Sequence, residues 1–376
     1  MSAPQGTQVT YATAGVDTEA GDKAVELMKD AVRATHGPQV LGGVGGFAGL
    51  FDASALLTYR KPLLATSTDG VGTKVAIAQA LDIHDTIGFD LVGMVVDDIV
   101  VVGATPLFMT DYIACGRVVP ERIAGIVRGI AAACSVAGTA LVGGETAEHP
   151  GLLGPDEYDV AGAATGVVEA DRLLGPERVR AGDVLLALGS SGLHSNGYSL
   201  VRKVVSVAGW TLDRHVDELG RTLGEELLEP TRVYASDCLA LAERAGVAGL
   251  HAFSHVTGGG LASNVARVLP QGLVADIDRG GWTLPPVFSL VQRLGQVPWT
   301  DLEGTLNLGV GMVAIVSADA VAGVLAHAGE LGLPAWELGT VRDADPRTDA
   351  VGAPGFVAGT KGVHGGAVQL TGAYRV

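Results

Sequence analysis

The segment ATSTDGVGTK at residues 65–74 combines a carboxylate, two glycines, a hydroxyl and a lysine at the predicted end of a strand. Gly70 and Gly72 would let the backbone approach an anion closely, and amides at a following helix start can bind phosphate. Asp69 would repel a bare phosphate, so this combination favours a divalent cation between the two. Taken alone, the segment is more typical of an aspartate helix cap followed by turn glycines.

The spacing of this segment differs from that of a Walker A loop, which needs four residues between its first glycine and the Gly-Lys pair. Here Val71 alone separates Gly70 from Gly72. A nucleotide site built on this segment would therefore lie outside the P-loop enzymes, with Lys74 balancing charge beside the phosphates.

Further carboxylates occur where apolar runs end or are interrupted. Asp97 and Asp98 are adjacent within an otherwise apolar segment, and Glu145 follows a predicted strand and two glycines. An uncompensated carboxylate in an apolar segment is costly, whereas Mg²⁺ held between protein and nucleotide phosphates requires such groups. Each acid alone is compatible with a cap or a surface charge; together with Asp69 they predict a metal site.

The second half of the chain offers an anion-binding turn, GSSGLHSNGYS at residues 189–199. A hydrolase nucleophile elbow needs G-x-S-x-G, which this turn lacks. Ser195, Asn196 and the local amides are candidates for anion binding, and an ordinary capping turn is the alternative. His194 is the sharper candidate, because an imidazole can act as acid, base or donor near neutral pH.

A second glycine-rich helix start, HVTGGG, occupies residues 255–260. Thr257 is expected to cap the helix or to contact phosphate. The histidine that opens this segment, His255, is predicted to be structural.

The composition limits the class of protein. A chain of 376 residues exceeds what one core usually supports, so two domains are expected. The 41 acidic residues outnumber the 25 basic ones, which opposes nucleic acid as the main partner. The three cysteines are scattered, and no apolar run is long enough for a membrane span. A reducing, cytoplasmic location is therefore predicted, with no membrane partner.

The elements that must position these residues alternate between strands and helices in both halves. The apolar residues of segment 90–102 fit either element, and helix is favoured because 106–114 supplies the next strand. In the first half the patterns predict helices at 22–35, 73–81, 90–102 and from residue 120, and strands at 62–68, 106–114, 139–142 and 159–168. In the second half they predict helices at 197–208, 232–245 and 319–331, a helix that TGGG (257–260) opens and that runs through 268, and strands at 184–188, 273–277 and 309–316.

These patterns indicate an α/β or α+β protein with two domains. The charged, turn-rich segment 169–182 separates them, which gives a first domain at 1–169 and a second at 170–345. Residues 346–376 are predicted to be a tail, because the glycine-rich sequence after residue 343 carries little pattern.

Ten segments in this order resemble the phosphoribosylformylglycinamidine cyclo-ligase family, the AIR synthetases of purine biosynthesis. They are YATAGVD (11–17), GGVGGFAGLF (42–51), STDGVGTK (67–74), HDTIGFDLVGMVVDDIV (84–100), LVGGETAEHPG (141–151), YDVAGAATGVVE (158–169), LGSSGLHSNGYSLVRK (188–203), LLEPTRVY (227–234), HVTGGGLASNVARVLP (255–270) and NLGVGM (307–312).

The resemblance implies a homodimer in which the N-terminal domains form an intersubunit β-barrel, and a C-terminal α/β domain that helps to close the active site. It also implies the reaction: formylglycinamidine ribonucleotide (FGAM) and ATP give aminoimidazole ribonucleotide (AIR), ADP and phosphate. The formamide oxygen is phosphorylated first, and the amidine nitrogen then closes the ring.

The resemblance assigns roles to individual residues. Lys29 and His194 match catalytic positions, and the loop at 42–49 matches a lid. Contacts to ATP are implied for Gly45, Gly46, Asp69, Gly70, Gly72, Thr73 and Lys74; contacts to Mg²⁺ for Asp69, Asp97, Asp98 and Glu145; and contacts to the substrate for Ser190, Ser191, Gly192, Ser195, Asn196, Thr257, Gly258 and Gly259.

Two positions depart from the family pattern: Asp97 stands where the family often has asparagine, and His149 where it has methionine. Thiamine-monophosphate kinase, selenophosphate synthetase and a hydrogenase maturation protein are related alternatives with a similar ATP site. Selenophosphate synthetase would need a reactive cysteine near the N-terminus, and the first cysteine here is Cys115. A noncatalytic nucleotide sensor is the remaining alternative, although it would not need both glycine-rich turns of the second half.

Overall fold

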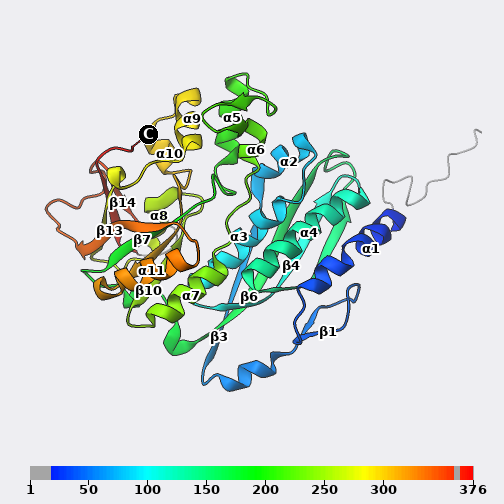
Figure 1. The fold of residues 1–376 in the computed structure, drawn as a ribbon, viewed down its shortest axis with the longest axis horizontal. Coiled ribbons are helices and arrows are strands. Elements are labelled where there is room, and N and C mark those ends of the chain that lie inside the picture. Colours follow the sequence, from blue (N-terminus) through cyan, green and yellow to red (C-terminus); the bar gives the residue numbers. More distant parts are fainter. Residues whose placement is uncertain (1–17, 360–364, 376) are drawn as a thin grey trace, which may run out of the picture.

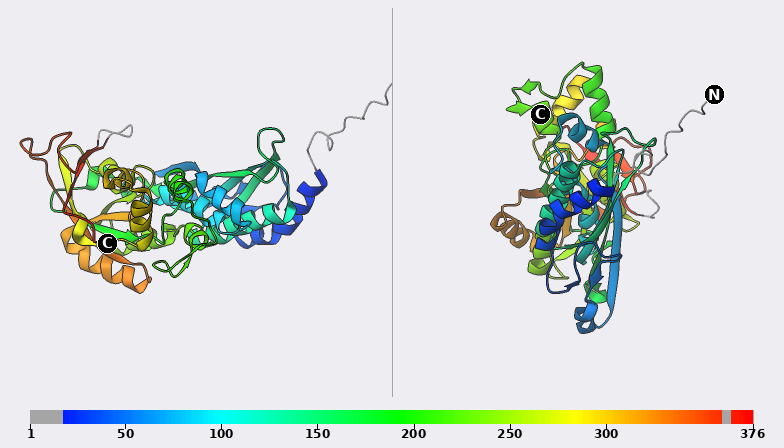
Figure 2. Two further views of the ribbon diagram at one scale, coloured as in Figure 1. Left: turned by 90° about the horizontal axis from the view of Figure 1, so that it is seen from above. Right: turned by 90° about the vertical axis from the view of Figure 1, so that its right-hand side faces the viewer.

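The computed structural model describes residues 18–359 and 365–375, so the YATAGVD segment at 11–17 lies outside the described part. Within the described part the molecule is elongated, with a four-stranded sheet near one end and a seven-stranded sheet near the other (Figures 1 and 2). Helices pack on both sheets, so the predicted α/β class with two domains is confirmed. Among the described helices, none is long and apolar enough to cross a membrane.

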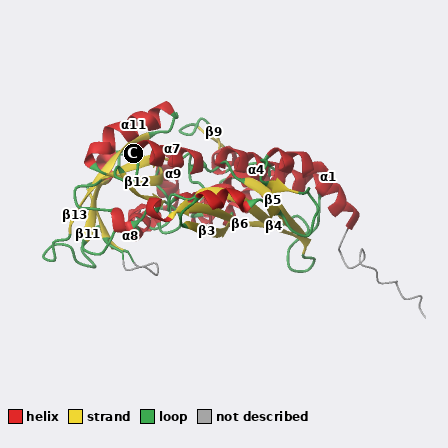
Figure 3. Cartoon of the chain, turned by 90° about the horizontal axis from the view of Figure 1, so that it is seen from below, coloured by secondary structure: helices red, strands yellow, loops and turns green. Residues whose placement is uncertain are grey.

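The N-terminal domain is built on the sheet β3-β6-β4-β5, in which only the β4–β5 pair is parallel. Figure 3 shows α1 and α4 on one side of these strands. Helix α4 begins with a proline at its first turn and ends at Gly138 in the left-handed conformation. The elements are α1 (Thr18–Ala34), β1 (Val40–Leu41), β2 (Leu50–Phe51), β3 (Pro62–Gly70), α2 (Val75–Leu81), α3 (Ile87–Val100), β4 (Thr105–Cys115), α4 (Pro120–Ala137), β5 (Ala140–Glu148) and β6 (Tyr158–Glu169).

Helices α3 and α4 approach each other very closely at two glycines. A Cβ added to Gly88 would lie 2.0 Å from the backbone of Gly129. Any side chain at either position would therefore push α3 away from α4. This contact matters for function because α3 carries Asp90, Asp97 and Asp98 beneath the end of β3.

The strand register divides the sheet residues between two faces. Asp69, Gly162, Asp111 and Gly144 lie opposite one another in one row across β3, β6, β4 and β5. Because alternate residues point to opposite faces, this row belongs to the face that α3 covers, where Asp111 is buried. The other face carries partly exposed residues such as Leu64, which is 64% exposed.

The C-terminal domain is built on the sheet β10-β12-β7-β13-β11-β15-β14. Strand β12, VGMVAIV, is buried along its whole length and lies between β10 and β7. The strands are β7 (Val184–Gly189), β10 (Leu250–His255), β11 (Leu273–Asp278), β12 (Val310–Val316), β13 (Ala335–Asp343), β14 (Phe356–Ala358) and β15 (Ala367–Thr371), with a separate hairpin of β8 (His215–Val216) and β9 (Arg221–Thr222). The helices are α5 (Tyr198–Val207), α6 (Leu223–Leu227), α7 (Ala235–Ala245), α8 (Gly260–Arg267), α9 (Pro286–Gly295), α10 (Trp299–Glu303) and α11 (Val321–Glu330).

The structure corrects the prediction of a separate tail at 346–376. Strand β15 pairs in parallel with β11, and β14 pairs with β15, so the described part of this segment completes the second sheet. Both strands are short, and one of them lacks alternation in burial, so periodicity does not reveal them. Sequence reasoning also did not identify α6, α9, α10, β10 or β13, whereas the helix assignment of 90–102 is confirmed by α3.

Candidate functional site

The end of β3 and the anion-binding turn of the second domain lie against each other. Ser195 Oγ donates a buried hydrogen bond to the carbonyl of Val71 at 2.7 Å. The hydroxyls of Thr73 and Ser199 lie 3.1 Å apart. The sequence placed these two segments 120 residues apart in different domains, and the structure joins them into one site.

One of the two glycines at this junction has a left-handed backbone. Gly72 has a φ of 74°, which a side chain would strain, and it opens a single 3₁₀ turn that leads directly into α2. Asp69 Oδ1 accepts a hydrogen bond from the amide of Gly70 at 2.7 Å. Burial raises the pKa of Asp69, the Gly70 amide lowers it, and the negative charge of Asp98 raises it further.

Asp69, Asp98 and His255 form a polar cluster at the domain junction. His255 Nδ1 lies 2.8 Å from Asp98 Oδ1, and its ring is buried. Burial lowers the pKa of His255, but the hydrogen bond to Asp98 and the charges of three carboxylates outweigh it, so the net shift is upward. Sequence reasoning assigned His255 a structural role and missed this contact; its place beside a glycine-rich turn was the available signal.

Asp69 and Asp98 suit a magnesium ion shared with nucleotide phosphates. Mg²⁺ in such sites takes one or two carboxylates and completes its shell with phosphate oxygens and water. The upward shift in the pKa of Asp69 shows that a nearby cation would relieve an electrostatic cost. No group of three or more metal-binding side chains occurs among residues 18–359 and 365–375, so the predicted four-residue set is not assembled within one chain.

The structure contradicts Asp97 as a metal ligand. Its carboxylate is fully buried, and both oxygens lie 3.0 Å from the amide of Tyr234, at the start of α7. Burial raises the pKa of Asp97 to about 7, against the opposing effect of His255. Adjacent residues on a helix point about 100° apart, so Asp98 reaches the cluster while Asp97 anchors α7 to α3.

We predict that Asp97→Ala lowers the free energy of unfolding by about 1–3 kcal/mol, because the buried amide of Tyr234 loses its acceptor. Urea unfolding measures this change, and nucleotide titration in the presence of Mg²⁺ should give the parent affinity. Asp97→Asn keeps an acceptor oxygen and serves as the matched control. A large loss of Mg²⁺-dependent nucleotide affinity in Asp97→Asn would contradict the anchoring role.

Lys74 does not face an open phosphate site. Its side chain is fully buried, and its ammonium lies 2.6 Å from Asp90 Oδ1 and 2.6 Å from the carbonyl of Glu229. This corrects the expectation that Lys74 balances charge on the nucleotide. The neighbouring hydroxyl of Thr73 and the amides of the 69–74 turn are the groups that remain for an anion.

Glu145 is separated from Asp69 within one chain. It lies opposite Tyr112 in the β4–β5 ladder, one residue out of step with the row that contains Asp69. The two carboxylates therefore point to opposite faces of the sheet, across three strand spacings of about 14 Å in all. A single ion cannot bind both carboxylates of the same chain.

The glycine-rich loop and Glu145 share a cavity of about 300 Å³ with helix α1. Gly45, Gly46 and Glu145 all line it, together with the buried Asp111. Lys29 lies on the same helix, where its ammonium pairs with Glu26 at 2.5 Å. The structure thus brings three residues of the predicted nucleotide site together, away from the cluster around Asp69, and leaves Lys29 on α1 beside them.

We predict that Asp111→Asn stabilises the chain more at pH 8 than at pH 5. Burial raises the pKa of Asp111 from 3.8 to about 7. Between these values the folded chain holds a proton that the unfolded chain has released, so stability falls as pH rises. Thermal unfolding at both pH values measures this, with the exposed Asp319→Asn as control. An equal shift at both pH values would contradict it.

The 189–199 turn is held by side chains from the second domain. Asn307 Nδ2 donates to the carbonyl of Gly192 at 2.9 Å, and Ser190 Oγ donates to Asn307 Oδ1 at 3.3 Å. Asn196 lies beside the 257–259 turn, because a Cβ added to Gly258 would lie 3.2 Å from its side-chain oxygen. The predicted substrate residues of the two glycine-rich turns therefore lie side by side.

His194 has an unusual backbone and an unpaired ring nitrogen. It is buried with a φ of 60°, and its Nε2 accepts a hydrogen bond from the amide of Ser191 at 3.1 Å. Its Nδ1 has no hydrogen-bond partner among the described residues. Burial, followed by the positive charges of His255, Lys74 and Arg232, lowers the pKa of His194 well below 6.5. The neutral ring with Nε2 as acceptor must carry its proton on Nδ1, which leaves one buried donor for a ligand.

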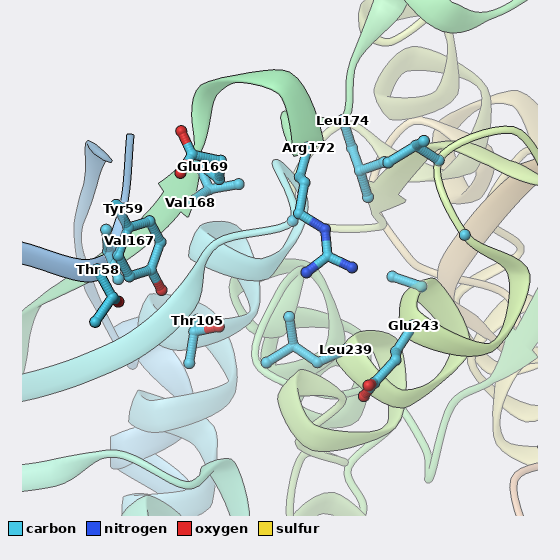
Figure 4. A pocket seen from close by; sticks show the side chains of 14 residues that line it. Thr58, Tyr59, Thr105, Val167, Val168, Glu169, Arg172, Leu174, Leu239 and Glu243 are labelled. Atoms are coloured by element: carbon cyan, nitrogen blue, oxygen red, sulfur yellow. The ribbon is translucent and has the colours of Figure 1, made fainter. Parts of the chain in front are cut away.

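A larger cavity of about 500 Å³ lies at the other end of the N-terminal sheet (Figure 4). Arg172 projects from above towards Leu239, and Glu243 lies on the helix below. None of the residues predicted for nucleotide, metal or substrate lines this cavity. The predicted site residues therefore lie at the junction around Asp69 and His194 or at the smaller cavity beside α1, and not here.

Both halves of the chain match domains of the AIR synthase related proteins: the N-terminal domain over residues 51–168 and the C-terminal domain over residues 180–349. Solved structures share the fold: the chain superposes on thiamine-monophosphate kinase from Stenotrophomonas maltophilia with a TM-score of 0.64 at 18% identity, covering 92% of this chain and 96% of that one. For E. coli HypE the TM-score is 0.61 at 20% identity, with 93% and 95% covered.

Curated relatives are much closer in sequence. Phosphoribosylformylglycinamidine cyclo-ligase from Geobacillus sp. (strain WCH70) is 50% identical over 91% of this chain and 98% of its own length. The enzyme of the same name from Anaeromyxobacter dehalogenans is 50% identical over 90% and 97%, respectively. The chain belongs to the phosphoribosylformylglycinamidine cyclo-ligase family.

Proposed function

We propose that this protein catalyses the ATP-dependent cyclisation of FGAM to AIR, with release of ADP and phosphate, in purine biosynthesis. The observation that carries the proposal is 50% identity to a cyclo-ligase over 91% of the chain. The fold neighbours at 18–20% identity, a thiamine-monophosphate kinase and HypE, support the fold alone. The contact between the Asp69 turn and the His194 turn supports a site with the nucleotide on one side and the substrate on the other.

The proposed reaction has two steps. The formamide oxygen of FGAM attacks the γ-phosphorus of ATP, and the bond to ADP breaks. The amidine nitrogen then attacks the formamide carbon, the carbon–oxygen bond breaks, phosphate leaves with that oxygen, and a nitrogen proton is lost. Bound Mg²⁺ would neutralise phosphate charge in the first step.

The residues of this chain supply positioning and hydrogen bonds to these steps. Asp69 and Asp98 would hold Mg²⁺, and the amides of the 69–74 turn would bind phosphate oxygens. The Nδ1–H of His194 would donate to the formamide oxygen or to the phosphoryl oxygen attached to it, since it is a buried donor with no partner in the described chain. A neutral donor at this place lowers the cost of negative charge without itself losing a proton.

The test of this proposal is direct. Purified protein with FGAM, ATP and Mg²⁺ should form aminoimidazole, detected by coupling to a chromogenic diazo reagent, with one ADP released for each AIR. Removal of Mg²⁺ with a chelator should stop both products. ATP that stabilises the protein in thermal unfolding while FGAM does nothing, and no AIR forms, would favour a noncatalytic nucleotide sensor.

The second part of the proposal is a homodimer through the uncovered face of the N-terminal sheet. This face carries Leu64 on β3, 64% exposed, and Tyr112 on β4, 41% exposed. Apolar and aromatic side chains on a regular sheet face support a protein interface. Within one chain Glu145 lies on the opposite face of the sheet from Asp69, so Glu145 would join an Asp69 site only from a second copy, at the end of β3.

Mixing two inactive variants tests this shared site. We predict that Asp69→Asn and Glu145→Gln chains, each inactive alone, recover about a quarter of parent activity after subunit exchange, since half of the dimers then hold one intact site. The measurement is AIR formation before and after exchange in low denaturant. Parent mixed with either variant is the control. If subunits exchange but AIR formation does not recover, either both residues act in a site within one chain or Glu145 is not part of the Asp69 site.

The cytoplasmic location stays a proposal, supported by cysteine usage. Cys115, Cys134 and Cys238 are all free and buried. Burial raises the pKa of each thiol, which suits inert core residues in a reducing compartment.

A further inference from the structure

We propose that Lys74 and Asp90 form a positioning pair: a buried ion pair that fixes the segment 229–232, and through it the His194 turn, against the end of β3. The proposal rests on the proposed function, because it concerns the placing of His194 for the same reaction. It gives the lysine of DGVGTK a task other than contact with phosphate.

The pair joins three separate parts of the chain. Lys74 Nζ lies 2.6 Å from Asp90 Oδ1 on α3, and it also donates to the carbonyl of Glu229 at 2.6 Å. The same Asp90 oxygen accepts from the hydroxyl of Thr231 at 2.6 Å and from its amide at 3.1 Å. Both charged side chains are 0% exposed, so solvent does not screen their attraction.

The hydrogen bonds continue from this segment to the imidazole. Ser191 Oγ donates to the carbonyl of Pro230 at 2.6 Å and accepts from the amide of Arg232 at 3.1 Å. The amide of Ser191 then donates to His194 Nε2 at 3.1 Å. Every link from Lys74 to the ring is a direct contact, and the last one determines which ring nitrogen carries the proton.

The burial of the pair opposes movement of Lys74 towards a nucleotide. If the ammonium left, the carboxylate of Asp90 would remain buried without a counter-charge, and its Oδ2 has no hydrogen-bond partner among the described residues even now. The ring of Tyr198, with its centroid 5.5 Å from Nζ, covers a further side of the ammonium. Removing one partner of such a pair is costly, whereas replacing both with apolar groups is often tolerated.

This difference provides the test. We compare Lys74→Met, Asp90→Leu and the double variant with Lys203→Met, which changes an exposed lysine on α5. Each single variant should lower kcat about 100-fold, the effect of misplacing a catalytic group by about 1 Å. Affinity for a non-hydrolysable ATP analogue should stay within about threefold of parent, and the double variant should recover at least about tenfold in kcat.

Phosphate binding by Lys74 predicts the opposite pattern. Lys74→Met would then weaken binding of the ATP analogue by more than about tenfold, and Asp90→Leu would leave this binding unchanged. The double variant would recover no kcat, and this result overturns the proposal. If the single variants do not fold, Thr231→Val removes one hydroxyl bond to Asp90 without changing side-chain size. It should lower kcat without changing nucleotide affinity, and an unchanged kcat would likewise overturn the proposal.

A readout without turnover separates this proposal from the proposed function. ¹⁵N NMR of the imidazole reports the tautomer of His194 in any folded variant. Lys74→Met or Thr231→Val should shift its Nε2 signal, while Lys203→Met should not. If the parent makes no AIR but the variants shift the Nε2 signal, the proposed function is wrong and the positioning pair is supported. If the parent is active and the variants leave the signal unchanged, the proposed function is supported and the positioning pair is wrong.

Discussion

Asp69→Asn is expected to lower kcat/KM for AIR formation by about 10³-fold, because a metal ion contributes several kcal/mol of charge stabilisation to phosphoryl transfer. The carboxylate lies at the end of β3, half-buried, with its pKa raised by burial and by Asp98. Asparagine has nearly the same shape and keeps an acceptor oxygen for the Gly70 amide. The substitution therefore removes one negative charge and little else.

Stability should respond in the opposite direction to activity. A group whose folded pKa is raised loses stability as pH rises past its unfolded value, so removing the charge of Asp69 should leave the melting temperature at pH 7.5 equal or higher. Steady-state AIR formation measures the activity, nucleotide titration with and without Mg²⁺ measures metal-dependent binding, and thermal unfolding measures the stability. Asp319→Asn, an exposed aspartate in the second domain, is the matched control. Activity within about tenfold of parent would exclude Asp69 as a metal ligand.

The sequence predicts which segments build the site, because their glycines, hydroxyls and carboxylates are visible in it directly. Asp69 ends the apolar strand β3 and Asp98 interrupts the apolar helix α3, and this pattern predicts that both bind the same metal ion. The adjacent Asp97 looked equivalent, but one residue on a helix changes the direction by about 100°, and only packing against α7 decides which acid is buried.

Lys74 and Glu145 illustrate a second limit. A lysine that follows two glycines is typical of a phosphate ligand, but Lys74 pairs with the buried Asp90 instead. This contact joins residues of different elements, so the local sequence does not predict it. Glu145 depends on strand parity: a shift of one residue in register would bring it to the face of Asp69. Register is fixed by the whole sheet, so the local sequence does not contain this information.

The described part of the C-terminal segment shows the same limit for the fold. Strand β15 is five residues long, and its neighbour β11 lies about 90 positions earlier in the chain. Parallel strands are not joined by a hairpin turn, so no turn motif in the sequence predicts this pair. The strongly periodic helices, by contrast, were predictable because their apolar stripes are set by local spacing.

His194→Asn is expected to lower kcat about 10²–10³-fold with a smaller effect on the KM for FGAM, since the lost Nδ1–H acts on charge that develops during the reaction. Asparagine is the informative replacement because it tolerates the left-handed backbone at a φ of 60°, where alanine would add strain. Its side chain is too short to reach the Ser191 amide at the position of Nε2, so thermal unfolding of the variant must show that the turn persists.

The pH profile distinguishes a neutral donor from a titrating base. With its pKa held well below 6.5 by burial and nearby positive charge, His194 stays neutral above pH 6.5, so it should add no ionisation to kcat between pH 6.5 and 9. Folding stability should fall as pH drops below 6.5, because the unfolded histidine takes up a proton that the folded one refuses, and His194→Asn should reduce that fall. Stopped assays across pH, paired with thermal unfolding at pH 5 and 8, measure both effects. A parent kcat that rises about tenfold per pH unit near pH 7 and loses this dependence in His194→Asn would identify His194 as a general base instead.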